Sequence, residues 1–71
     1  MTEIVIREEY IKLDSALKLA GFVSTGGQAK MMILEGLAKV NGNVCTQRGK
    51  KLYDGDKASL NGEELIVKSC K

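Results

Sequence analysis

The chain has 71 residues, a formal net charge of +2, 44% hydrophobic residues and 4% aromatic residues. This length holds one domain with a small core, and the hydrophobic content excludes wholesale disorder. No apolar run approaches the ~20 residues of a membrane-spanning helix, and the acidic start, MTEIVIREEY, lacks the pattern of a signal peptide. We therefore expect a single cytoplasmic domain over residues 1–71, without a membrane partner.

A short edge strand and a helix are predicted at the beginning of the chain. Residues 3–7 alternate in polarity with a period of two, which indicates a strand. From Leu13 the apolar residues recur at i, i+3, i+4 and i+7, which is the stripe of an amphipathic helix. Gly21 is a typical stop for this helix. Lys12 is expected to open the helix, and Lys18 lies off its apolar stripe.

A second short helix is predicted directly after the first. Thr25 and Gln28 have the spacing of a capping box, in which each side chain satisfies a backbone N–H group at the start of a helix. Gly36 ends the apolar stripe that follows. Phe22, the only phenylalanine, is expected to fill the junction between the two helices.

The period becomes two after the second helix, which predicts short strands. Asn41-Gly42 and Asn61-Gly62 each lie between such strands, and Asn-Gly is the strongest local signal for a two-residue hairpin turn. Asp54-Gly55-Asp56 predicts a further turn that returns the chain to the sheet. The predicted fold class is α+β, with two short packed helices, a small twisted antiparallel sheet and the N-terminal edge strand.

Positive charge is concentrated in the middle of the chain. Residues 10–53 contain seven lysine or arginine residues and two acidic residues, whereas both flanking segments are net negative. Arg48, Lys50 and Lys51 lie within four positions around Gly49, which is expected to let the backbone turn sharply and approach a partner. Because clustered like charges repel, we expect them to face an anionic partner and to form one basic groove with Lys12, Lys30 and Lys39.

Residues 12–56 resemble the S4-type RNA-binding domain, also called the α-L motif, and in particular the small stand-alone bacterial proteins of the YaaA/YbcJ type. The family pattern runs approximately R-L-D-x-x-L, S-R-S-Q-A-R, V-N-G, a basic stretch and G-D. The matching segments here are KLDSAL at 12–17, TGGQAK at 25–30, KVNG at 39–42 and GD at 55–56. The resemblance implies an α-L fold that binds folded RNA, often ribosomal RNA, through its helix pair and the following hairpin.

The predicted RNA contacts combine the basic residues with the positions that match the family motif. They are Lys12, Lys18, Thr25, Gly26, Gly27, Gln28, Lys30, Lys39, Asn41, Arg48, Gly49, Lys50 and Lys51.

One position departs from the family pattern. The family often has arginine directly after the cap of the second helix, where this chain has Gly26. We hypothesise that Gly26 and Gly27 expose backbone N–H groups that bind a phosphate. The alternative is that both are merely flexible cap residues.

An enzyme and a protein-binding module are the competing interpretations. The chain has no histidine, Cys45 has no evident catalytic partner in the sequence, and turn chemistry accounts for Asp54 and Asp56. Cys45 and Cys70 form no CxxC pair and are expected to be reduced thiols, with a disulfide between them as the alternative. We therefore predict a non-catalytic, monomeric RNA-binding protein without a cofactor, a metal or a small-molecule substrate. A module that binds an acidic protein through the basic loop, which consists of Arg48, Gly49, Lys50 and Lys51, remains the alternative.

Tyr53 lies beside the basic loop and has two possible roles. Its ring is able to stack on a nucleic-acid base, but covering the core is the favoured interpretation from the sequence.

Overall fold

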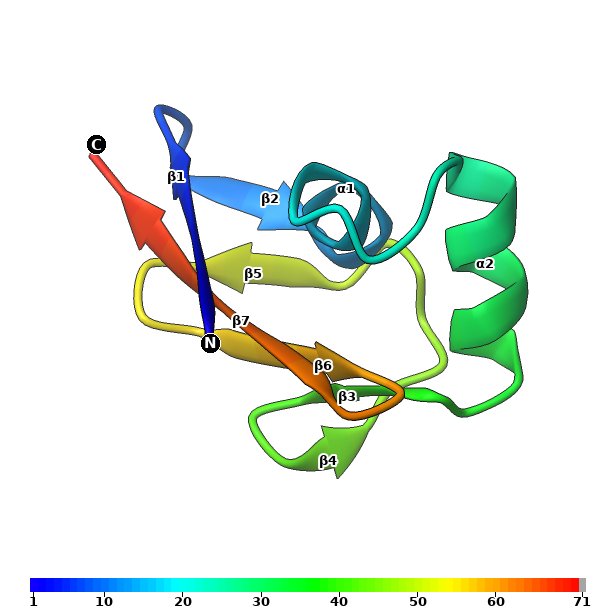
Figure 1. The fold of residues 1–71 in the computed structure, drawn as a ribbon. Coiled ribbons are helices and arrows are strands. Elements are labelled where there is room, and N and C mark those ends of the chain that lie inside the picture. Colours follow the sequence, from blue (N-terminus) through cyan, green and yellow to red (C-terminus); the bar gives the residue numbers. More distant parts are fainter. Residues whose placement is uncertain (71) are drawn as a thin grey trace.

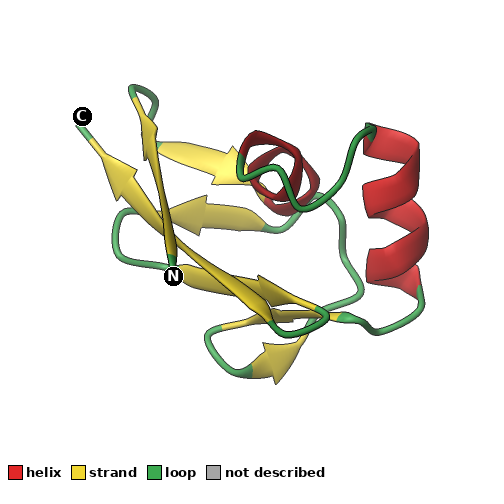
Figure 2. Ribbon diagram, viewed as in Figure 1, coloured by secondary structure: helices red, strands yellow, loops and turns green. Residues whose placement is uncertain are grey.

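The computed structural model of the protein describes residues 1–70. Residues 1–70 form two helices and seven short strands, and most of these residues lie in strands and loops (Figure 2). In chain order these are β1 (Thr2–Ile6), β2 (Tyr10–Lys12), α1 (Leu13–Leu19), α2 (Gly26–Leu34), β3 (Ala38–Val40), β4 (Asn43–Val44), β5 (Lys51–Tyr53), β6 (Lys57–Leu60) and β7 (Glu63–Ser69). The α+β class with two short helices is confirmed.

The strands form two separate sheets. Five strands make the larger sheet in the order β1-β7-β6-β3-β4, and β2 pairs with β5 in a two-stranded sheet. Figure 1 shows α1 between β2 and α2, with β3, β4 and β6 of the larger sheet below them. Within residues 1–70, neither helix is long and apolar enough to cross a membrane.

The larger sheet is mixed, which corrects the prediction of a wholly antiparallel sheet. Strand β1 lies at the sheet edge, as predicted, but it pairs with β7 in a parallel direction. Parallel neighbours need a long crossover connection. Here β1 and β7 lie at opposite ends of the chain, so the whole intervening domain forms that crossover.

The β2–β5 pair was missed by the sequence prediction. It is antiparallel, with Tyr10 opposite Tyr53, Ile11 opposite Leu52 and Lys12 opposite Lys51. Each strand has three residues, and only the central residue faces the core: Leu52 is fully buried and Ile11 packs against the core. Lys12 therefore ends a strand and occupies the N-cap position of α1, and it is not the first residue of the helix.

The core is aliphatic, as the scarcity of aromatic residues predicts. Phe22 is partly buried against this core between the two helices, in agreement with the sequence analysis. The fully buried larger side chains come from both helices and from both sheets. They are Leu13, Leu17, Ile33, Leu52, Leu65 and Val67.

Both predicted Asn-Gly turns are present. Asn41 and Asn61 have φ values of 51° and 49°, and the glycines that follow have φ values of 88° and 93°. Two successive residues with positive φ are the requirement of a type I′ turn, which suits asparagine and glycine. These turns connect β3 to β4 and β6 to β7.

Candidate nucleic-acid interface

The start of α1 is held by the backbone of the basic loop. The N–H groups of Leu13 and Asp14 donate hydrogen bonds to the carbonyl oxygens of Lys50 (2.8 Å) and Arg48 (3.1 Å). The first N–H groups of a helix have no partner within it, and Lys12 offers no side-chain cap. The loop carbonyls therefore take the place of the cap, and this fixes Arg48 and Lys50 beside the first residues of α1.

The loop itself is a tight turn that does not need glycine. The Lys50 N–H group donates to the Gln47 carbonyl at 3.1 Å, which closes the turn. Gly49 does not have a positive φ, and a Cβ atom at this position would meet no atom within 4 Å. The sharp turn was predicted correctly, but the special role of Gly49 in forming it was not.

Pairing of β2 with β5 completes a group of positive charges. Lys12 lies directly opposite Lys51, so their Cα atoms are about 4.5–5.5 Å apart. We call the resulting group the basic cluster: Lys12, Arg48, Lys50 and Lys51. All four side chains are exposed, and they come from two chain segments, one before and one after the two helices in the sequence. Like charges directly opposite on paired strands are unfavourable, so an anion between them would stabilise the domain.

Two tyrosines lie on the same face of the two-stranded sheet. Tyr10 and Tyr53 are directly opposite, with ring centroids 5.8 Å apart and ring planes inclined at 50°. The Lys51 Nζ atom lies 4.8 Å from the centroid of the Tyr10 ring. Tyr53 is 44% exposed, so the favoured expectation that it covers the core was wrong, because Leu52 does this.

The predicted residues at the start of α2 form its cap. The Thr25 hydroxyl accepts from the Gln28 N–H group at 3.1 Å, as a capping box requires. The Gln28 side-chain oxygen accepts from the Ser24 N–H group at 2.9 Å, one residue earlier than the capping box predicts. Gly26 and Gly27 are exposed, and phosphate binding by their N–H groups stays a prediction.

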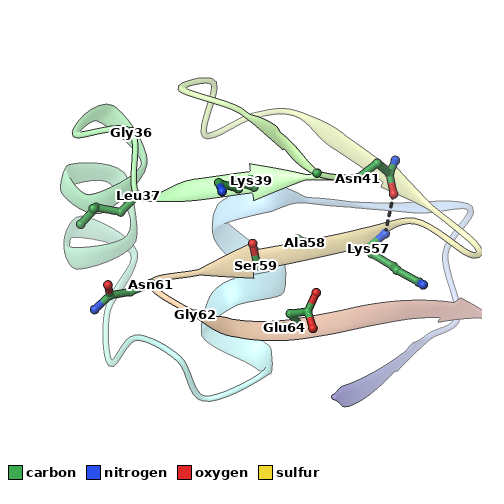
Figure 3. A pocket seen from close by; sticks show the side chains of 11 residues that line it. Gly36, Leu37, Lys39, Asn41, Lys57, Ala58, Ser59, Asn61, Gly62 and Glu64 are labelled. Carbon is green, nitrogen blue, oxygen red and sulfur yellow. Dashed lines mark hydrogen bonds between the residues drawn. The ribbon is translucent and has the colours of Figure 1, made fainter.

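The remaining predicted lysines lie outside the basic cluster. Lys30 is on the exposed side of α2, as predicted. Lys18 is in the last turn of α1, about 7–8 Å along the helix axis from Leu13. Lys39 lies between two buried residues of β3, so it occupies the outer face of the larger sheet, turned away from α1 (Figure 3). The predicted single groove is therefore divided between two faces.

Asn41 has a structural role that the sequence analysis did not assign to it. Its side-chain oxygen accepts from the Lys57 N–H group at 3.0 Å, which is the dashed line in Figure 3. Its side-chain nitrogen donates to Asp56 at 3.3 Å. These two bonds tie the β3–β4 turn to the start of β6.

We expect Asn41→Ala to lower the free energy of unfolding by about 1–2 kcal/mol more than Asn61→Ala does. Asn41→Ala removes two side-chain hydrogen bonds, and a typical hydrogen bond contributes about 0.5–1.5 kcal/mol. Both substitutions remove an asparagine with positive φ from the first position of an Asn-Gly turn. The hydrogen bonds found within residues 1–70 include two from the Asn41 side chain and none from that of Asn61. Urea unfolding followed by circular dichroism measures the difference, and equal losses would contradict the structural role of Asn41.

The two carboxylates of the turn before β6 bind backbone groups. Asp54 accepts from the Ser69 N–H group and Asp56 from the Tyr53 N–H group, both at 2.8 Å. The interpretation of both as turn residues is confirmed. Within residues 1–70, no group of histidine, cysteine, aspartate and glutamate has an arrangement that could hold a metal ion. Cys45 and Cys70 are free thiols.

Comparison with known proteins tests the resemblance on which the RNA contacts were predicted. The S4 domain family matches residues 4–68. The chain belongs to the S4 domain family. The sequence resemblance covered residues 12–56, and the family match extends it to most of β1 and most of β7.

Relatives of this S4 domain occur in two well-known bacteria. It is 41% identical over 59 residues to the Bacillus subtilis protein named "Probable ribosome maturation protein RlbA", which covers 83% of each chain. It is 36% identical over 61 residues to YbcJ of Escherichia coli, covering 86% of this chain and 87% of YbcJ. The solution structure of YbcJ, described as having an αL motif involved in RNA binding, is 33% identical and has a TM-score of 0.74. That alignment covers 96% of this chain and 87% of YbcJ, and it confirms the predicted α-L fold.

Proposed function

We propose that this S4 domain is a non-catalytic, monomeric protein of the cytoplasm that binds structured RNA, in ribosomal RNA or in a ribosome-assembly particle. The observation that carries the proposal is the convergence of Lys12 and Lys51, in paired strands, with Arg48 and Lys50 at the start of α1. Family membership and the names given to RlbA and YbcJ support the same function.

The basic cluster would act on the phosphate backbone. Each lysine or arginine that neutralises a phosphate releases condensed counterions, and this release drives binding without reading sequence. The deep, narrow major groove of an A-form helix hides its base edges, so selectivity would come from RNA shape and unpaired elements. The rigid turn of residues 47–50 holds two of these charges in place before binding.

We rank the other predicted contacts by their place in the fold. Lys30 and residues 25–28 are secondary contacts. They are exposed at the start of α2, which is joined to α1 by a short loop. Lys18 is a peripheral contact at the far end of α1. Lys39 would contact RNA only through the other face of the larger sheet, and Asn41 acts chiefly within the fold.

The salt dependence of RNA binding tests this proposal. Four phosphate contacts predict that log K falls against log salt with a slope of roughly −2.8 to −3.6. The affinity should therefore drop about 50- to 150-fold when KCl rises from 50 to 200 mM. Fluorescence anisotropy of a labelled ribosomal RNA hairpin measures this fall, with polyglutamate as a competitor.

The same titration separates RNA binding from binding of an acidic protein. Polyglutamate should compete weakly, because it carries charge without the geometry of RNA. A slope between zero and −1, or competition by polyglutamate as strong as that by unlabelled RNA, would contradict the proposal.

A further inference from the structure

The exposed tyrosine pair carries no charge, so neutralisation of phosphates does not explain its position. The chain has two tyrosines and no tryptophan, and both tyrosines lie on the outward face of the two-stranded sheet. Tyr10 is 36% exposed and Tyr53 is 44% exposed. The inward positions of the same strands belong to Ile11 and Leu52, so the rings are not needed to cover the core at this point.

Contact between the two rings stabilises the short β2–β5 pair, but this contact does not explain why both tyrosines keep surface exposed to solvent. Aromatic residues paired across two strands support the strands through their mutual contact. Both tyrosines remain partly exposed, beside Lys51 of the basic cluster. An aromatic surface beside cations has the two properties that a nucleotide requires, since its base has a π-face and its phosphate is an anion.

Lys51 places a positive charge directly beside an aromatic ring. Its ammonium group lies 4.8 Å from the centre of the Tyr10 ring, a cation–π distance. Lys12, on the neighbouring strand, is directly opposite Lys51. A base stacked on the exposed surface of the tyrosine pair would therefore have two positive charges, Lys51 and Lys12, close to its neighbouring phosphates.

We propose that Tyr10 and Tyr53 form a stacking surface for an unpaired RNA base, while the basic cluster holds the phosphates on either side of it. This inference rests on the proposed RNA-binding function and narrows its ligand. Bases inside a continuous A-form helix are stacked on each other and cannot reach a protein ring. The preferred ligand is therefore RNA with an unpaired nucleotide, in a loop or a bulge, and not an uninterrupted duplex.

Intrinsic tyrosine fluorescence reports on this surface alone. Because the chain has no tryptophan and its only tyrosines are Tyr10 and Tyr53, every tyrosine signal comes from the proposed site. We would titrate the wild-type protein with two RNAs of equal phosphate number, one an uninterrupted duplex and the other a stem with a single-nucleotide bulge. The bulged RNA is expected to quench the fluorescence strongly and to bind more tightly, whereas the duplex should leave the fluorescence almost unchanged.

Variants of Tyr53 distinguish the contribution of the ring to RNA affinity from the contribution of the neighbouring positive charges. Tyr53→Leu keeps an apolar side chain but removes the ring, and it should bind the bulged RNA about 5- to 150-fold more weakly with an unchanged salt slope. Tyr53→Phe keeps the ring and should bind as the wild type does. Tyr10→Leu provides a second ring deletion, and urea unfolding shows which of these variants are folded.

The possible results distinguish the inference from the proposed function. If neither RNA binds in a salt-dependent manner, the RNA-binding function is wrong and the stacking surface is wrong with it. If both RNAs bind equally, without quenching and without an effect of Tyr53→Leu, RNA binding stands and the stacking surface is refuted. The wild-type fluorescence comparison needs no variant, so it decides the question even if a tyrosine substitution unfolds the protein.

Discussion

Replacing Lys12 and Lys51 with alanine should make RNA binding much less sensitive to salt. The wild-type affinity is expected to fall about 50- to 150-fold between 50 and 200 mM KCl, and the double variant should fall only about 7- to 12-fold, because two of the four phosphate contacts are lost. The variant should bind more weakly at every salt concentration in this range, and the largest difference should appear at 50 mM KCl. Anisotropy titrations of one labelled RNA at several salt concentrations measure both quantities.

A second double variant controls for net charge. Lys57→Ala with Lys68→Ala lowers the formal net charge by the same two units, but both residues lie on the outer face of the larger sheet. This control should keep a salt slope close to that of the wild type. Equal losses in the two double variants would mean that diffuse positive charge, and not the basic cluster, attracts the RNA.

Removal of the charged pair should not unfold the domain. Lys12 and Lys51 are like charges directly opposite each other on paired strands, an arrangement that opposes folding slightly. The Lys12→Ala, Lys51→Ala variant should therefore stay within about 0.5 kcal/mol of the wild type, because the relieved repulsion offsets the lost contact between Lys51 and the Tyr10 ring. A lost affinity in this variant can then be assigned to the missing contacts.

Leu52→Ala should destabilise the domain by about 2–5 kcal/mol, the usual range for truncating a buried leucine. Leu52 has no exposed surface, and it is the only residue of β5 that faces the core, because Lys51 and Tyr53 point outward. A domain of this length has a total stability of about 4–11 kcal/mol, so the loss would be a large part of it. Urea unfolding at 25 °C measures the change.

Leu34→Ala is the matched control for this prediction. It removes the same atoms from a leucine that is 59% exposed on α2, and alanine favours a helix at least as well as leucine does. The free energy of unfolding should change by less than about 0.5 kcal/mol. A comparable loss in both variants would contradict the view that Leu52 anchors the β2–β5 pair to the core.

Local features of the fold were predictable from the sequence. The apolar stripe from Leu13 identified α1, and Thr25 identified the start of α2, because helix signals depend on residues within one or two turns of each other. The Asn-Gly turns were predicted for a similar reason, since their positive φ values are properties of the turn residues themselves. The ordered motifs from residue 12 to residue 56 also identified the S4 domain family correctly.

Part of the candidate site was predictable as well. Arg48, Lys50 and Lys51 are close in sequence, and their concentration around Gly49 marked the basic loop directly. Lys12 was predicted to join the basic groove from its place at the start of the first helix, and it also matches the family motif. The strands β2 and β5 had a weak signal, an apolar residue between two polar or amphipathic ones, but three residues are too few to establish a period of two.

Only the tertiary structure decided which faces these residues share. The pairing of β2 with β5 places Lys12 opposite Lys51 and Tyr10 opposite Tyr53, although both helices and the strands β3 and β4 lie between them in the chain. The parallel pairing of β1 with β7 and the outward position of Lys39 have the same origin. Such non-local pairings depend on which apolar surfaces the whole chain can bury together, whereas helices and turns are specified by neighbouring residues. The sequence by itself therefore determined the helices, the turns, the family and the basic loop, and folding determined that the loop, the start of α1 and the tyrosine pair form one surface.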